Sequence, residues 1–469
     1  MDPTDRMPLD LVTPDLLVRH DRPGPRYTSY PTAVEFDDRF TAEHYAKRLA
    51  QANERGSDPL SLYVHIPFCK RRCSFCGCNV IISKRPEPVR KYLDYLFKEI
   101  DLLASALRDR RTLLQYHWGG GTPTYLDIAQ MKALMSKVTD HFDIAPQAEV
   151  AIEIDPEVTT IEQLEAAREI GFNRLSIGVQ DFTPKVLEAV RRAQSVEQTR
   201  LLLETARDLG FGSVNIDLIY GLPHQNPTNF ATTLDKVIEM RPQRVAVYSF
   251  AYVPWIKRNQ KELPVDYLPD RETKFALFAL AIRAFLGAGY VQIGMDHFAL
   301  PDDELGQAST SRKLHRNFMG YTVHRAPDMI GLGVSSIGSL CDAFAQNVKK
   351  APQYYRAIDE GRFPIERGYV LSEDDRIRRH VITELMCNFR VNARQVSELF
   401  KIDFHNYFGS EIDELRAPGG QAEQGFVSVE QDGVEVLPLG RLFVRNVCMV
   451  FDAYLKKKNG DGQVFSRTV

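Results

Sequence analysis

The chain has 469 residues, 44% of them hydrophobic, so it is long enough for a sizeable core and for more than one domain. Its 59 Lys and Arg residues nearly balance its 62 Asp and Glu residues, which leaves a formal net charge of −3. Because the chain offers no overall positive field, this composition argues against nucleic acid as a partner.

Residues 1–60 are predicted to form an arm that covers the functional site. The segment RPGPRYTSYPTAVEF contains Pro23, Pro25 and Pro31, which exclude a long helix at that place. The first residues, MDPTDRMPLD, are acidic and contain prolines where an export signal has a basic start and an apolar run. We therefore expect a cytoplasmic protein, and no disulfide framework among its seven cysteines.

Six β-rich runs follow, each succeeded by a stretch whose apolar residues recur at helical spacing. The runs begin at Ser61, Gln115, Ala148, Asn173, Ser213 and Arg244. This alternation predicts an α/β fold of parallel strands with right-handed crossovers, either doubly wound or closed toward a barrel. Six units favour a partial (βα)6 TIM-like barrel, which we place with its C-terminal extension at residues 61–370. Functional groups are expected where the strands end.

The rest of the chain is predicted to be mostly helical. The apolar stretch FALFALAIRAFLGAGYVQIG, from Phe275, carries Arg283 and glycines, so we expect a buried amphipathic helix and no membrane insertion. Helical character resumes near Ser372, and GFVSVEQDGVEVLPL predicts a hairpin around Asp432 and Gly433. Residues 371–469 are therefore expected to form a winged-helix-like cap. Since it lacks a basic stripe, packing or lid formation is favoured over nucleic-acid binding.

Four of the cysteines lie within HIPFCKRRCSFCGCNV, residues 65–80. Cys69, Cys73 and Cys76 make a CxxxCxxC pattern, and the three basic residues between the first two argue against a buried core position. A structural zinc site needs four ligands, and no second CxxC or HxxxH is present, although a zinc-binding protein remains an alternative. Three thiolates on one short loop suit three irons of a [4Fe-4S] cluster and leave the fourth iron open. The other cysteines, Cys341, Cys387 and Cys448, are predicted to be core residues.

A CxxxCxxC motif directly after the first strand of a βα ladder resembles the radical S-adenosylmethionine (SAM) superfamily. Within it, the chain is similar to the oxygen-independent coproporphyrinogen III oxidases, also called coproporphyrinogen dehydrogenases. The similarity covers nearly the whole chain and is carried by RPGPRYTSYPTAVEF, YVHIPFC, CSFCGCN, HWGGGTPTYL, SIGVQDF, NIDLIYGLP, HRNFMGYT, GLGVSSIGS and RNVCMVFDAYL.

The resemblance implies a set of site residues. Cys69, Cys73 and Cys76 match the ligands of a [4Fe-4S] cluster, which makes them the catalytic and metal-binding residues, while Cys78 is a non-ligand. One SAM is implied on the fourth iron and a second beside it. Positions that match the first SAM site are Tyr63, Gly120 and Glu153; those that match the second are Phe75, Gly121, Thr122, Gln180, Arg192, Asp217, Ala251 and Ile337.

Some of these residues also carry a physical reason of their own. Asp217 is acidic within an apolar strand, where its carboxylate can accept hydrogen bonds from ribose hydroxyls. Glu153 shares a strand face with Asp155, and barrel strands rarely have a solvated face. A guanidinium such as that of Arg192 can bind a carboxylate in bidentate fashion. His65 is interpreted as a satisfied core residue outside the site.

The implied reaction is the oxidative decarboxylation of two propionates of coproporphyrinogen III to vinyl groups, which gives protoporphyrinogen IX in haem biosynthesis. It needs an electron donor and an acceptor, both unidentified, and we expect a monomer. Arg22, Arg26, Arg312 and Arg316 are candidates to hold the substrate's carboxylates. The alternative is a related haem chaperone that binds and transfers haem. Gly77 with Cys78, together with the N-terminal arm, favours the oxidase.

Overall fold

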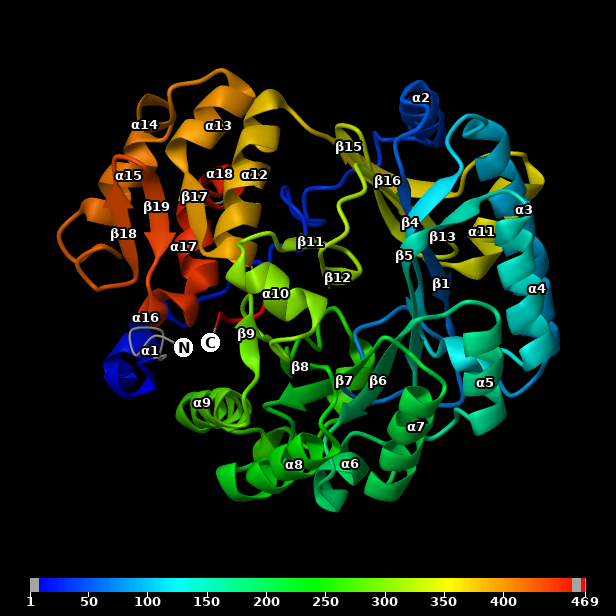
Figure 1. Ribbon diagram of the computed structural model, residues 1–469, viewed down its shortest axis with the longest axis horizontal. Coiled ribbons are helices and arrows are strands. Elements are labelled where there is room, and N and C mark those ends of the chain that lie inside the picture. Colours follow the sequence, from blue (N-terminus) through cyan, green and yellow to red (C-terminus); the bar gives the residue numbers. More distant parts are fainter. Residues whose placement is uncertain (1–7, 458–464, 469) are drawn as a thin grey trace.

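A computed structural model describes residues 8–457 and 465–468. All six predicted β-rich runs are strands that lie side by side as parallel neighbours in chain order, and they curve around a central space (Figure 1). They are β1 (Leu60–Ile66), β4 (Thr112–Gly120), β5 (Asp143–Ile154), β6 (Arg174–Gln180), β7 (Ser213–Tyr220) and β8 (Arg244–Ser249). The predicted partial barrel is therefore confirmed.

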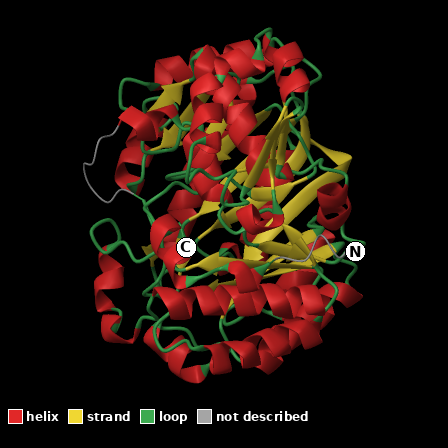
Figure 2. Ribbon diagram, turned by 90° about the vertical axis from the view of Figure 1, so that its left-hand side faces the viewer, coloured by secondary structure: helices red, strands yellow, loops and turns green. Residues whose placement is uncertain are grey.

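Helices on the outer side of the strands provide the crossovers, and Figure 2 shows a layer of them along the strands. They are α3 (Glu87–Ala106), α4 (Ile128–Thr139), α5 (Ile161–Glu169), α6 (Pro184–Ala189), α7 (Val196–Asp208), α8 (Pro227–Met240) and α9 (Arg271–Gly287), with 3-10 turns at Pro123–Tyr125, Arg258–Glu262 and Val265–Tyr267. The side chains of Asp127, Thr160 and Asn226 accept hydrogen bonds from backbone N–H groups of the first turn and so fix where α4, α5 and α8 begin.

The sheet extends beyond the predicted ladder at both edges. Within the described residues it has 12 strands, in the order β16-β15-β14-β13-β1-β4-β5-β6-β7-β8-β10-β9. Next to β1 lies a further parallel strand, β13 (Asp328–Leu332), followed by antiparallel β14 (Ile337–Leu340), β15 (Ala343–Asn347) and β16 (Ile365–Val370). At the other edge are β10 (His297–Ala299) and β9 (Val291–Ile293), so the end of the stretch predicted as a helix from Phe275 is a strand.

Shorter elements connect these parts. They are β2 (Phe68–Cys69), β3 (Ile81–Ile82), α10 (Glu304–Thr310), the hairpin of β11 (His315–Asn317) and β12 (Gly320–Thr322), and α11 (Ala351–Asp359). In Figure 1 the β11–β12 hairpin lies between β15, near one edge of the sheet, and helix α12 (Glu373–Asn388).

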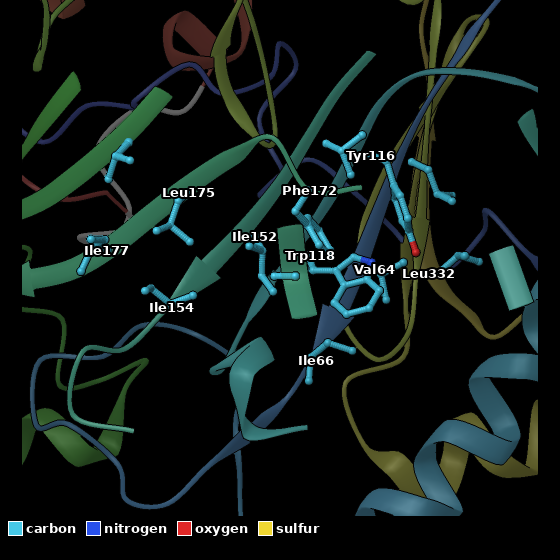
Figure 3. Close-up of a cluster of buried hydrophobic side chains, with 14 of the residues drawn as sticks. Val64, Ile66, Tyr116, Trp118, Ile152, Ile154, Phe172, Leu175, Ile177 and Leu332 are labelled. Carbon is cyan, nitrogen blue, oxygen red and sulfur yellow. The ribbon is translucent and has the colours of Figure 1, made fainter. Parts of the chain in front are cut away.

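Along the barrel strands, apolar side chains point outward and polar ones point into the central space. Figure 3 shows the outward cluster, in which Trp118 packs edge-on against Phe172 with ring centroids 4.9 Å apart. Both rings are fully buried. Figure 3 also labels Val64, Ile66, Tyr116, Ile152, Ile154, Leu175, Ile177 and Leu332. Alternate positions such as His117 and Asp217 line inner hollows, so the strand period of two separates the core from the site.

The C-terminal part combines helices with a small sheet, as predicted. Besides α12 it contains α13 (Ala393–Phe400), α14 (Phe404–Tyr407), α15 (Gly409–Arg416), α16 (Pro438–Arg441), α17 (Val444–Val450) and α18 (Ala453–Lys457), and a sheet in the order β17-β19-β18. The predicted hairpin is β18 (Val427–Glu430) with β19 (Gly433–Val436), and β17 (Arg390–Asn392) pairs with it. None of the described helices combines the length and apolar character that a membrane crossing requires.

The N-terminal arm divides between two cores. It contains a 3-10 turn (Leu9–Leu11), α1 (Pro14–His20) and α2 (Ala42–Asn53). Tyr27 packs in the C-terminal core, and its hydroxyl donates to Asp452 Oδ2 at 2.9 Å. Leu49 of α2 is instead fully buried in the barrel core. The domain boundaries near residues 60 and 370 stay a prediction.

Candidate active site

The cysteine loop lies at the carboxyl edge of the barrel, where it follows β1 and begins at Cys69 in β2. Cys69, Cys73, Cys76 and Cys78 all line one hollow of about 300 Å³. All seven cysteines are free thiols. Of the other three, Cys387 and Cys448 are buried core residues as predicted, while Cys341 is partly exposed. The loop therefore collects four thiols at the place where a βα fold builds its site.

Each of the three motif thiols has a different polar neighbour. Cys69 Sγ lies 3.6 Å from Thr122 Oγ1, and Arg192 Nη1 donates toward Cys73 Sγ at 3.7 Å. The backbone N–H of Cys78 donates to Cys76 Sγ at 3.4 Å. Such donors stabilise sulfur in its thiolate form. The fourth cysteine thus contributes its backbone to the neighbouring motif sulfur.

Two amides that the sequence analysis missed hold this loop in shape. Asn259 Nδ2 lies within hydrogen-bond distance of three loop carbonyls, those of Cys73 (3.2 Å), Ser74 (3.1 Å) and Cys76 (3.1 Å). Gln260 Nε2 donates to Phe75 O at 3.1 Å. Both residues come from the turn after β8, far away in the sequence, so no local signal identifies them. The loop conformation therefore depends on the opposite side of the barrel.

The glycine run at the end of β4 packs against residues of the chain itself. A Cβ atom on Gly119 would lie 2.7 Å from Glu153 Oε1, and one on Gly121 would lie 2.6 Å from Phe68 O. Gly120 has a φ of +115°, and its Cβ would lie 2.5 Å from the His65 ring. Glycine is required here because β4 ends in close contact with β5 and with the cysteine loop.

Two carboxylates face the hollow from β5 and β7. Burial opposes ionisation of Glu153, but hydrogen bonds from His117 Nε2 (3.2 Å) and Gly120 N (3.2 Å) keep its pKa below the ordinary value. For Asp217, burial and the nearby charge of Glu153 raise the pKa to about 6. Asp217 accepts hydrogen bonds from Asn215 and Ser176. The two carboxyl groups therefore ionise in different pH ranges.

Arg192 bridges the carboxyl ends of β5 and β6. Its Nη2 donates to Asp155 Oδ1 at 2.9 Å and to Gly178 O at 2.6 Å, and its Nε donates to Gln194 Oε1 at 3.0 Å. Gln180 has a φ of +70° at an irregularity in the β6–β7 pairing, which turns the strand end toward the hollow.

Eleven of the fourteen predicted site residues line this hollow. They are Cys69, Cys73, Phe75, Cys76, Gly120, Gly121, Thr122, Glu153, Gln180, Arg192 and Asp217. Tyr63, Ala251 and Ile337 do not line it. The Tyr63 hydroxyl lies 3.1 Å from His65 Nδ1, and Ile337 packs at an apolar cluster with Phe36 and Phe344. Ser176, Gly178 and Tyr248, which were not predicted from the sequence, also line the hollow.

His65, which we placed outside the site, is a buried residue with polar partners. Its Nε2 lies 2.9 Å from Asn79 O, just beyond the cysteine loop, and burial lowers its pKa. Below this point a second hollow of about 130 Å³ shares Glu153, Ser176, Asp217 and Tyr248 with the first and reaches the β11–β12 hairpin. The inner space of the barrel thus continues from the cysteine loop toward the hairpin.

Comparisons with known proteins identify the family of the chain. The family model of the radical SAM superfamily matches residues 63–237, which include the end of β1, the cysteine loop and β4 to β7. An oxygen-independent coproporphyrinogen III oxidase of Synechocystis sp. is 44% identical over 462 residues, with 97% of each chain covered. The enzyme of the same name from Escherichia coli is 44% identical over 454 residues, covering 97% of this chain and 98% of its own.

A solved structure supports the same assignment over the whole fold. Coproporphyrinogen III oxidase (HemN) from Escherichia coli, described as a radical SAM enzyme, superposes with a TM-score of 0.88 at 44% identity, covering 92% of this chain and 97% of its own. These matches extend through the arm and the C-terminal part, beyond the barrel that the superfamily shares. The chain belongs to the oxygen-independent coproporphyrinogen III oxidase family of the radical SAM superfamily.

Proposed function

We propose that the protein converts coproporphyrinogen III to protoporphyrinogen IX without oxygen. Two propionate side chains become vinyl groups, and each loses carbon dioxide, one hydrogen atom and one electron. The observation that carries the proposal is the convergence of Cys69, Cys73 and Cys76 on one hollow at the carboxyl edge of the barrel, in a chain whose full-length relatives bear the name of this activity.

The cofactors are those of the superfamily, a [4Fe-4S] cluster and SAM. When bound, they supply a carbon-centred radical that removes a hydrogen atom from the substrate. The donor set fits this group, because three free thiols with polar neighbours face a hollow of about 300 Å³, within the range typical of cofactor sites. Cys69, Cys73 and Cys76 would hold the cluster. Cys78 lies at the same hollow but is proposed as a non-ligand.

The other predicted site residues of the hollow are proposed to bind two SAM molecules. Glu153, kept ionised by His117, is suited to accept hydrogen bonds from an ammonium group, and Asp217 is suited to ribose hydroxyls. Thr122, Gln180 and the glycine backbone provide further polar groups. For Tyr63, Ala251 and Ile337, which lie outside the hollow, the proposal rests on sequence position alone.

Around these cofactors the chain itself positions groups and excludes water. Asn259 and Gln260 hold the cysteine loop, and the apolar outer layer of the strands fixes the inner groups in place. An external one-electron donor is required because generation of the radical consumes an electron. An electron acceptor is required because each decarboxylation releases one. We further propose that the protein acts as a cytoplasmic monomer.

An anaerobic assay tests the proposal. The cluster is reconstituted, and a reductant, SAM and coproporphyrinogen III are added. We expect 5'-deoxyadenosine and protoporphyrinogen IX to be formed together, in a ratio that reflects two decarboxylations per product. SAM cleavage without vinyl product would contradict the proposed substrate. Transfer of bound haem to an acceptor protein without decarboxylation would instead support the chaperone alternative.

A further inference from the structure

A separate, smaller cavity lies between the arm, the β11–β12 hairpin, strands β13–β15 and α12. Its volume is about 30 Å³. Among the described residues its lining contains two arginines, Arg316 from β11 and Arg379 from α12, and no Asp or Glu. The cavity is therefore a positively charged space inside a protein whose overall charge is negative.

Arg379 differs sharply from its neighbour Arg378 on the same helix. Arg378 forms ion pairs with Asp374 and Glu411, both at 2.9 Å. Arg379 has no ion pair within residues 8–457 and 465–468; its Nη2 lies 3.3 Å from Ser339 Oγ, and its guanidinium stands 4.9 Å from the centre of the Phe344 ring. Burial lowers its pKa to about 10. Arg379 is partly buried, and a cation largely removed from water without a carboxylate is unfavourable unless an anion joins it.

Arg316 also keeps a free donor. Its Nη1 donates to Arg26 O at 2.8 Å, and its guanidinium lies 5.1 Å from the centre of the Tyr321 ring. Its buried Nε has no hydrogen-bond partner. Since a buried N–H without a partner is costly, this donor is a second and independent sign that an acceptor belongs in the cavity.

The size of the cavity limits what can enter. A cavity of about 30 Å³ can hold roughly two or three water molecules. That is enough for a carboxylate group and far too little for a pyrrole ring. An open groove of about 520 Å³ lies next to the cavity. Arm residues 27–29 and Phe318 line both spaces. The groove offers room for a larger body to which such a carboxylate is attached.

The β11–β12 hairpin separates the cavity from the inner space of the barrel, which contains the candidate active site. Arg316, Asn317 and Phe318 of the β11–β12 hairpin line the cavity, while Met319, Gly320 and Tyr321 line the lower hollow of the barrel. That hollow shares Glu153 and Asp217 with the site. A ligand with several carboxylates around one ring can therefore place one carboxylate in the cavity while another reaches the site.

We propose that Arg379 and Arg316 form a binding site for a carboxylate of the tetrapyrrole substrate, one that is retained while another propionate reacts. The inference rests on the proposed function for the identity of the ligand. Arginine suits this role because its guanidinium binds carboxylates through charge-assisted hydrogen bonds. Arg316 was a candidate from the sequence; Arg379 was not.

The test compares Arg379→Gln with Arg376→Gln in the full-length reconstituted protein. Arg376 is exposed on the same helix, and its replacement by Gln removes the same charge. The probe is coproporphyrin III, a stable fluorescent tetracarboxylate with the side chains of the substrate. We expect its Kd to rise about tenfold or more in Arg379→Gln, the effect of losing hydrogen bonds between charged groups, and to stay unchanged in Arg376→Gln. Cleavage of SAM in the absence of substrate should be equal in all three proteins.

A second variant guards against loss of folding. Arg379→Met removes the charge and keeps an unbranched side chain, so its Tm should equal or exceed that of the wild type. Coproporphyrin III should raise the Tm of the wild type and raise that of Arg379→Met much less. If the wild type and both Arg379 variants bind the probe equally, the inference is wrong. If the wild type does not bind the probe at all, the proposed function fails with it.

Discussion

The polar groups at the two ends of the barrel's inner surface have different partners. At the amino ends of the strands, Arg244 pairs with Asp303 and Glu304, both at 2.9 Å, and Arg174 pairs with the same Glu304. Glu149 lies 3.7 Å from each arginine. At the carboxyl ends, free thiols line the hollow and Asp217 has a raised pKa.

This contrast separates a structural role from a chemical one. At the amino end, Arg174 and Arg244 are paired with carboxylates of the chain itself. The carboxyl-end groups are held in place by neighbours such as Asn259, but their reactive atoms face open space. Perturbed and unsatisfied groups at the carboxyl edge of a barrel are the ones expected to meet substrate or cofactor. Mutations at the two ends should therefore change different properties.

The largest effect is expected from Cys73→Ala. Loss of one of three thiolates should abolish the [4Fe-4S] absorption and EPR signals and the decarboxylation activity, while the apoprotein keeps its Tm. Cys78→Ala is the matched control, since it removes a thiol from the same hollow but keeps the backbone N–H that reaches Cys76 Sγ. Iron and sulfide contents equal to those of the wild type are expected for the control. A cluster that survived in Cys73→Ala would disprove the ligand assignment.

At the amino end, Arg244→Met should affect stability most. It leaves the buried Asp303 without its main ion-pair partner, which costs about 3–5 kcal/mol for a buried pair. Denaturant unfolding of the apoprotein measures this loss. Arg200→Met breaks an exposed ion pair with Glu239 and should cost less than about 1 kcal/mol. Equal losses in the two variants would contradict the structural role of the network.

Asn259→Ala tests whether the opposite side of the barrel holds the cysteine loop. Three loop carbonyls lose a donor, so we expect the loop to loosen by about 1–3 kcal/mol. The readouts are a shifted or broadened EPR signal of the reduced cluster and faster loss of iron to a chelator. Lys261→Ala, at an exposed position of the same segment, should leave both unchanged. An unaltered EPR signal in Asn259→Ala would assign the amide to packing alone.

Much of the fold was predictable because the strands carry a strong local pattern. All six predicted β-rich runs are parallel strands, and Ser372 begins the helical C-terminal part as the cap of α12. The strands β13 and β15 were missed, because they are short and their residues are buried on both faces, as in Asp328–Leu332. A segment without alternation gives periodicity nothing to detect.

The site residues also divide into those that the sequence could predict and those that it could not. The thiols, the glycine run and Asp217 stand out locally, since their residue types are unusual for a buried strand end. Asn259, Tyr248 and Arg379 do not, because an ordinary polar residue becomes significant only through partners distant in the sequence. Asn259, for example, reaches carbonyls more than 180 residues away. Such pairs require the fold to be known first.

The smallest effect concerns pH and returns to Asp217. Its pKa in the folded protein is raised to about 6 by burial and by the nearby charge of Glu153, whereas an unfolded chain has its ordinary pKa near 3.8. Between these values the folded state binds the proton more tightly, so the free energy of unfolding falls as the pH rises through this range.

Asp217→Asn should remove this dependence, because the amide cannot ionise. Allowing for partial exposure of the carboxyl group, we expect the wild-type apoprotein to lose about 1 kcal/mol more than Asp217→Asn between pH 5 and pH 7. Urea unfolding at the two pH values measures the difference. Asp208→Asn, exposed at the end of α7, should retain the wild-type slope. If all three proteins showed one slope, Asp217 would be an ordinary ionised carboxylate, and the contrast between the two ends of the barrel would rest on the thiols alone.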